Sequence, residues 1–290
     1  MVLQTASHAR SISAPSFPHP IAIKAAEELR NLKTCIHGTG ASFSTLCSLL
    51  QGLADLFESL HLLLRLPSFQ QVLSQPSHKS WIEAQLDCSL QLLDIEAPLN
   101  DYLASVKSFV LDLQSAIRRR GDNGHVNSRK KAQKEALSCS KSLKKLEEGF
   151  VIAALVKKEG DLVMLDRLTR ESWETTVAVL QFLLTLLEMP VRRKAWSKRI
   201  LLVPKAMQWK RGGSGEGNGE ASKAVGLESL LNAAVERISG KDDVFGNLQR
   251  KADEELNQVK SGIEGLEIGL QRLFRRMIQN RVVLLNMLSF

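Results

Sequence analysis

A long heptad pattern near the C-terminus constrains the fold of this chain more than any other feature of its sequence. Nine of its ten a and d positions are apolar over five heptads, and Asn280 is the polar exception. The ten positions are Leu256, Val259, Ile263, Leu266, Leu270, Leu273, Met277, Asn280, Leu284 and Met287. A seam of this regularity is typical of a coiled coil. It predicts a helix over residues 247–289, roughly 65 Å long at the usual rise per residue.

Neighbouring apolar residues widen this seam, so we expect the helix to pack inside a bundle rather than in a two-stranded coil. The widening residues are Phe274, Ile278, Leu285 and Leu288. Asn280 fits two roles, a residue that fixes the register or the oligomer state or a rim residue that faces solvent. Gly262, Gly265 and Gly269 each cost about 1 kcal/mol against alanine in a helix. The spacing of the last two fits either close approach of a neighbouring helix or simple tolerance at the surface.

The rest of the chain also reads as helical, because leucine recurs at intervals of three and four and alternating patterns are nearly absent. Helices are expected over 21–34, from a cap at Ser42 or Ser44 to the residues before Pro67, over 69–73, from Ser77 or Ser80 to Arg120, over 128–158 and over 162–189. Pro98 lies inside one of these patterns, so we expect a kink or a break there. The predicted fold is all-α: an elongated bundle of about six main helices, with the C-terminal helix as its spine.

The predicted organisation is a disordered tail over 1–20 and a single helical domain over 21–290. The first 26 residues contain no Asp or Glu, which also fits an organelle transit peptide, although three prolines and few basic residues favour a tail. Residues 211–222 are rich in glycine and are expected to form a flexible loop. Their order does not match the glycine patterns of nucleotide-binding loops.

The formal charge of +8 is concentrated in two segments of the 290-residue chain. Seven basic residues and only Glu135 occur between Arg129 and Lys145, and eight basic residues without any acid occur between Arg192 and Arg211. Such segments attract partners that carry phosphate, either nucleic acid or anionic lipid. The remainder of the chain is net acidic.

The segment 190–211 combines its charges with Trp196, Trp209 and several aliphatic residues, as an interfacial membrane helix does. The candidate residues for an anionic surface are Arg192, Arg193, Lys194, Lys198 and Arg199. A solvated helical face is the plainer alternative. Nucleic-acid binding is less favoured, because no DNA- or RNA-binding motif accompanies the charges. The most apolar run, 177–187, is too short to span a bilayer.

Sequence patterns of catalysis, metal binding and cofactor binding are absent. The four cysteines are at least twelve residues apart, so no zinc spacing occurs, and the six histidines are scattered. We therefore expect no catalytic residue, no metal and no cofactor. Few cysteines and the lack of a hydrophobic signal sequence favour an intracellular and cytoplasmic protein, with plastid targeting or peripheral membrane association as alternatives.

A short motif in the tail points to one protein partner. Arg10, Ser11, Ser13 and Pro15 follow the RSxSxP pattern of ligands for 14-3-3 adaptors, with Ser13 as the phosphoacceptor. A phosphate there would add about two negative charges and strong acceptors for an arginine cluster.

Several segments resemble a plant-specific family of uncharacterised proteins related to BYPASS. They are HARSISAPSFPHP at 8–20, DCSLQLLD at 87–94, IRRR at 117–120 and, most specific, GLQRLFRRMIQNRVVLLNML at 269–288. The resemblance implies a plant protein with a role in root and shoot development, and it carries over no catalytic residue, cofactor or ligand. We expect a non-enzymatic intracellular interaction protein. The alternative is a peripheral membrane protein that binds anionic lipid through 190–211.

Overall fold

Helices account for nearly all of the chain that the computed structural model describes, which comprises residues 19–38, 42–119, 125–153, 161–187 and 245–289. They are α1 (Pro20–Gly38), α2 (Phe43–Leu64), α3 (Pro67–Leu73), the 3₁₀-helix η1 (Pro76–His78), α4 (Lys79–Leu93), α5 (Glu96–Arg119), α6 (His125–Ala153), α7 (Asp161–Leu186) and α9 (Phe245–Leu288). No strand occurs within these ranges, so the predicted all-α fold is confirmed. The glycine-rich segment 211–222 and most of the predicted tail lie outside them, and the expected domain organisation stays a prediction.

Local sequence signals explain where several helices begin. The Oγ of Ser42 accepts a hydrogen bond from the backbone N–H of Thr45 at 3.1 Å and caps α2. Pro67 occupies the first turn of α3, where its missing N–H is not needed. The break expected near Pro98 lies slightly earlier, between the end of α4 and the start of α5, and Pro98 falls in the first turn of α5. Seven described helices therefore reach 15 residues or more, where about six were expected.

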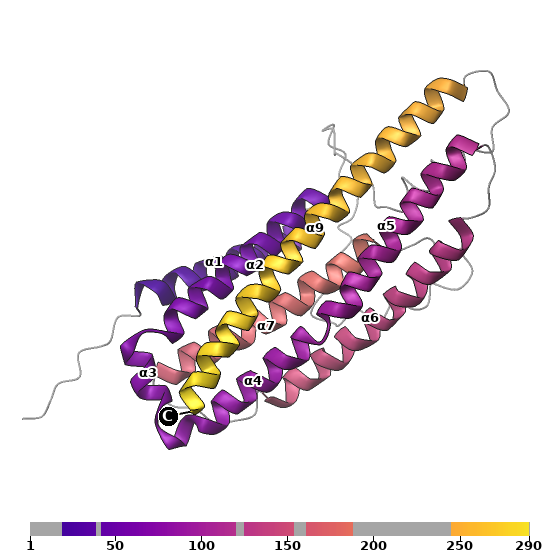
Figure 1. Cartoon of the computed structure of the whole chain (residues 1–290). Coiled ribbons are helices and arrows are strands. Elements are labelled where there is room, and N and C mark those ends of the chain that lie inside the picture. The colour runs from indigo at the N-terminus through magenta and orange to yellow at the C-terminus, as the bar shows by residue number, and fades with distance from the viewer. Residues whose placement is uncertain (1–18, 39–41, 120–124, 154–160, 188–244, 290) are drawn as a thin grey trace, which may run out of the picture.

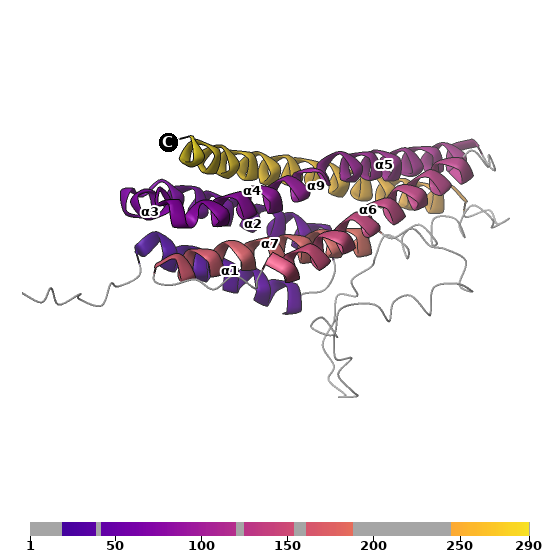
Figure 2. The same cartoon turned by 90° about the horizontal axis from the view of Figure 1, so that it is seen from below.

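Helix α9 runs along the bundle as its spine (Figure 1). Its first half lies beside α5, where Gln114 Nε2 donates to Asn257 Oδ1 at 2.9 Å. Its second half packs against α2 and α4, and Arg276 there pairs with Glu58 of α2 at 2.8 Å. Figure 2 shows α9, α4 and α5 on one side of the molecule and α1 and α7 on the other. The long C-terminal helix thus bridges the α1–α2 pair and the α5–α6 pair.

The predicted seam of α9 forms part of the hydrophobic core. Nine of its ten positions are buried, and Met287, near the end of the helix, is partly buried against the core. Asn280 is only 5% exposed, and its Nδ2 donates to the backbone oxygen of Phe57 on α2 at 2.9 Å. The solvent-facing alternative for Asn280 is therefore wrong, because its amide is inserted between α9 and α2.

Three glycines of α9 face α2 and allow the two helices to approach closely. A Cβ atom added to Gly262 would lie 2.5 Å from ring atoms of Phe43. The same atom on Gly265 would lie 3.0 Å from the Sγ of Cys47, and on Gly269 it would lie 3.0 Å from the Cβ of Leu50. Of the two alternatives left open above, the close approach of a neighbouring helix is confirmed.

Helix α2 is the one described helix that is long and apolar enough to cross a membrane, judged by length and composition alone. Eleven of its residues are buried in the bundle, where α2 packs against α1, α7 and α9. The core helix of a water-soluble bundle has the same length and composition, so this feature is weak support for a membrane span.

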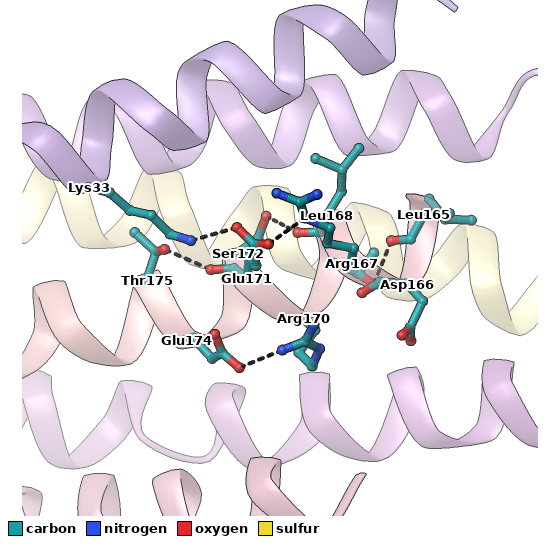
Figure 3. Close-up of polar contacts among 11 residues, drawn as sticks. Lys33, Leu165, Asp166, Arg167, Leu168, Arg170, Glu171, Ser172, Glu174 and Thr175 are labelled. Carbon is teal, nitrogen blue, oxygen red and sulfur yellow. Dashed lines mark hydrogen bonds and ion pairs between the residues drawn. The ribbon is translucent and has the colours of Figure 1, made fainter. Parts of the chain in front are cut away.

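Glu171 of α7 forms one ion pair that joins α1 to α7 and a second pair within α7 (Figure 3). Lys33 Nζ of α1 donates to its Oε2 at 2.5 Å, and Arg167 Nε donates to its Oε1 at 2.7 Å. Burial raises the pKa of Glu171, but the hydrogen bonds from Lys33 and Arg167 outweigh it and leave the pKa below its ordinary value of 4.5. The charged form of Glu171 therefore stabilises the folded protein.

Replacing Glu171 by glutamine is expected to lower the free energy of unfolding by about 0.5–1 kcal/mol at neutral pH, because both cations are partly exposed and screened by solvent. A lowered folded-state pKa gives stability that is present above the unfolded-state pKa and lost as the pH falls. The deficit of Glu171→Gln should therefore shrink as the pH falls below the ordinary pKa of 4.5 and vanish only below the lower folded-state pKa. Urea unfolding across this pH range measures the difference.

The matched control is Glu174→Gln, which removes an exposed pair on the same helix, Arg170 with Glu174 at 3.3 Å (Figure 3). It should change stability by no more than about 0.3 kcal/mol at any pH. Equal effects of the two variants would show that Glu171 does not join α1 to α7.

Candidate anion-binding face

Only one of the two basic segments lies within the residues that the structure describes. The candidate residues Arg192, Arg193, Lys194, Lys198 and Arg199 lie outside the described residues, and so does the proposed phosphosite Ser13. The other basic segment, from Arg129 to Lys145, lies entirely in α6 and is described. The site is therefore built from α6.

One face of α6 is apolar and attaches the helix to the bundle. Ala132, Cys139, Leu143 and Leu146 recur at helical spacing, and all four are buried. They face α5 and α7, which are the main neighbours of α6. Helix α6 therefore lies at one edge of the bundle (Figure 1), with its opposite face turned away from the core.

Six exposed lysines cover that opposite face, and we refer to them together as the lysine face. They are Lys130, Lys131, Lys134, Lys141, Lys144 and Lys145. Four of them, at 130, 134, 141 and 144, fall within an arc of about 80° around the helix axis. The row is roughly 22 Å long at the usual helical rise. The packing of one side of α6 thus places the charges in a line on the other side.

None of the six ammonium groups forms an ion pair with a carboxylate in the part of the chain that the structure describes. The acids of α6 up to residue 147, Glu135 and Glu147, are only partly exposed. Glu147 accepts a hydrogen bond from Gln181 of α7 at 3.3 Å. Glu135 lies near buried Cys139: burial, with a smaller contribution from Glu135, raises the pKa of that thiol to about 11.

Four exposed cations on other described helices pair with an acid one turn away. These pairs are Lys24 with Glu28, Arg167 with Glu171, Arg170 with Glu174 and Arg250 with Glu254. On α6 two such neighbours are like-charged, Lys130 with Lys134 and Lys141 with Lys145, while Lys131 has Glu135 one turn away without forming an ion pair. Like charges at this spacing destabilise a helix by about 0.2–0.5 kcal/mol per pair. An anionic partner bound along this face would relieve that repulsion.

Two exposed apolar side chains interrupt the charges. Leu137 is 43% exposed, and its position falls inside the arc of the lysines. Val126 is 39% exposed and lies at the edge of the same arc, near the start of the helix. The face is therefore amphipathic in itself, with aliphatic groups among ammonium groups.

Polar groups also occur inside the bundle, where they join α4 to α7. Trp81 Nε1 donates to Asp166 Oδ1 at 2.8 Å, and Trp173 Nε1 donates to Gln85 Oε1 at 3.0 Å. A small apolar crevice with a volume of about 10 Å³, partly open to solvent, is lined by Trp81, Gln85 and Trp173 among others. The described residues contain no group of three or more His, Cys, Asp or Glu side chains placed to hold a metal ion. We interpret these pairs as structural, because each satisfies a donor that packing has buried.

The sequence indicates the charge of α6, but the predicted candidate residues lie in the other basic segment. Aromatic residues among the charges favoured 190–211, whereas α6 has none between Arg129 and Lys145. The signal for α6 was the recurrence of lysine at intervals of three, four and seven residues, opposite a buried stripe of the same period.

Comparison with known proteins gives one match. A family model described as Protein BPS1 matches residues 49–287, which is most of the chain. The match includes the segments 87–94 and 117–120 and nearly all of 269–288, so the family resemblance noted from the sequence is confirmed. No curated protein and no solved structure matches the chain.

Proposed function

Because this chain belongs to the BPS1 family, we propose that it is a non-enzymatic intracellular interaction protein that acts in plant root and shoot development. We assign its docking surface to the lysine face of α6, which binds an anionic partner. The observation that carries this assignment is the row of six exposed lysines without an acidic partner among the described side chains.

Two physical arguments support a binding role over a merely solvated face. The first is that four exposed cations on α1, α7 and α9 have an acid one turn away within ion-pair distance, whereas none of the six lysines has one among the described residues. The second is that clustered charges of one sign raise the local concentration of the opposite sign and speed encounter with a charged partner. Binding on an exposed helix needs no pocket, and an interaction protein of this kind needs no catalytic group.

Two narrower functions remain proposals that depend on residues outside the described ranges. Segment 190–211 carries the same chemistry as the lysine face and would enlarge the anionic docking surface. Phosphorylated Ser13 would add a separate site for 14-3-3 adaptors. Both are compatible with a cytoplasmic interaction protein, and neither is needed for the assignment of α6.

Removing four charges from the lysine face is expected to weaken binding to a soluble polyanion. The variant carries Lys130→Gln, Lys134→Gln, Lys141→Gln and Lys144→Gln in the full chain. Its affinity for heparin at about 0.15 M salt should fall at least tenfold, and the dependence of affinity on salt should become shallower, because fewer counterions are released. Elution from immobilised heparin and titration at several salt concentrations measure both quantities.

A control variant removes the same total charge from scattered exposed positions: Lys24→Gln, Arg30→Gln, Lys79→Gln and Lys251→Gln. It should keep nearly all of the heparin affinity, and circular dichroism should show equal helix content in both variants. Equal losses of affinity in the two variants would mean that net charge alone drives binding, and the assignment to α6 would then be wrong.

A further inference from the structure

Building on the proposed function, we infer that the anionic partner of the lysine face is the surface of a phospholipid bilayer. Helix α6 lies flat on the headgroups, its lysines contact lipid phosphates and carboxylates, and Leu137 with Val126 enters the boundary between headgroups and acyl chains.

The shape of the site fits a planar partner. The lysine face follows one straight helix at the edge of the bundle, and the buried stripe of α6 lies on the opposite side of the same helix. A flat membrane surface can contact a straight helix along the whole length of its exposed side, so the lysines at 130, 134, 141 and 144 can reach the membrane together. No groove is needed, and the bundle lies with its long axis along the membrane.

The residue types favour lipid over nucleic acid. All six residues of the face are lysines, whose compact ammonium groups act as point charges on flexible stems. Reading of bases relies instead on the planar fork of arginine and on amides, and single strands stack on aromatic side chains. From Arg129 to Lys145 the only arginine is Arg129 itself, which is half-buried, and aromatic residues are absent.

The exposed Leu137 favours a bilayer over other polyanions as the partner of the lysine face. Among lysines it gains nothing from a row of phosphates in water, but it gains an apolar environment at the headgroup boundary of a bilayer. The long stems of the flanking lysines let their ammonium groups stay at headgroup level while the aliphatic parts lie deeper. Charge and apolar contact therefore act on the same surface.

The test measures co-sedimentation of the full chain with vesicles that contain about 30% phosphatidylserine in phosphatidylcholine, with pure phosphatidylcholine as the neutral arm. Each lysine near an anionic surface is expected to strengthen binding by about fivefold. The variant with four glutamines should therefore lose at least a hundredfold in affinity for anionic vesicles. Neutral vesicles should bind little of any variant.

A second variant, Leu137→Gln, separates lipid from other polyanions. It should weaken binding to anionic vesicles by about threefold to tenfold, because the apolar contact is lost, while leaving heparin affinity unchanged. The matched control is Leu62→Gln, which alters a leucine of α2 that is 44% exposed and lies outside α6. This control should not change vesicle binding.

Three results would overturn the inference in distinguishable ways. Heparin binding that depends on the lysine face, without binding to anionic vesicles, would reject the lipid partner but keep the proposed function. Vesicle binding that survives the four glutamines but is lost on replacing Arg192, Arg193 and Lys194 by glutamate would move the membrane contact to the other segment. Tighter binding to duplex DNA than to vesicles, with no effect of Leu137→Gln, would assign the face to nucleic acid.

Discussion

Replacing Gly269 by valine is expected to destabilise the protein by about 3 kcal/mol or more, because it overpacks the contact between α9 and α2. Even the Cβ of the new side chain would lie 3.0 Å from the Cβ and Cδ1 of Leu50, and Leu50 is fully buried. The Cβ of Leu50 is fixed by the backbone of α2, so the helices themselves must move apart. Urea unfolding followed by circular dichroism measures the loss.

The direction of this change in stability distinguishes overpacking from helix propensity. In an exposed helix interior, glycine is slightly less favourable than valine, so helix propensity alone predicts a small gain. The matched control is Gly38→Val at the end of α1, where an added Cβ meets no atom within 4 Å. It should alter stability by no more than about 0.5 kcal/mol. A stable Gly269→Val protein would show that α2 and α9 are not in close contact.

Gly262→Ala tests the same contact between α9 and α2, with a smaller expected loss of stability. Its added Cβ would come closer to a neighbour, 2.5 Å from ring atoms of Phe43, but Phe43 is only half-buried and stands at the first turn of α2. The ring can rotate towards solvent, so Gly262→Ala should cost less than Gly269→Val despite the shorter distance. The freedom of the neighbour, more than the distance, decides the cost.

Phe57→Ala is expected to cost about 3–5 kcal/mol, as is typical when a large buried aromatic side chain is removed. Phe57 is fully buried in α2, and its ring lies 4.9 Å from that of Trp173 on α7. The same side chain lines the crevice beside the Trp173–Gln85 hydrogen bond. Its loss would open a cavity between α2, α7 and α9, which the rigid helices would fill only in part.

The control for this variant is Leu62→Ala, five residues further along α2 and 44% exposed. It should cost less than about 1 kcal/mol. Urea unfolding followed by tryptophan fluorescence is suitable because Trp173 contacts Phe57 directly. A cost for Phe57→Ala no larger than that of the control would contradict the packing of α2 against α7.

Much of the architecture follows from local patterns in the sequence. The seam from Leu256 to Met287 predicts both the existence and the buried face of α9, because helical periodicity depends only on residues one or two turns apart. Most other helix bounds agree within a few residues for the same reason. The break between α4 and α5 was harder to place, since Pro98 is equally acceptable in a first turn and at a kink.

The sequence does not determine the role of a residue whose partner lies elsewhere in the chain. Asn280 and Gly269 have the same sequence pattern whether they face solvent or a helix. Their roles depend on α2, more than 200 residues earlier in the chain, whose Phe57 carbonyl accepts from Asn280 and whose Leu50 packs on Gly269. No spacing within α9 carries that information.

The sequence and the tertiary structure likewise each determine a part of what is known about the lysine face. The sequence alone determined that α6 is a basic helix with an apolar stripe, because charge and periodicity are properties of neighbouring residues. Only the tertiary structure decided that α5 and α7 cover the stripe, that Glu147 is bonded to Gln181, and that the six lysines stay exposed without acidic partners among the described residues. Burial and ion pairing are properties of helices brought together, and distance along the chain does not specify which helices meet.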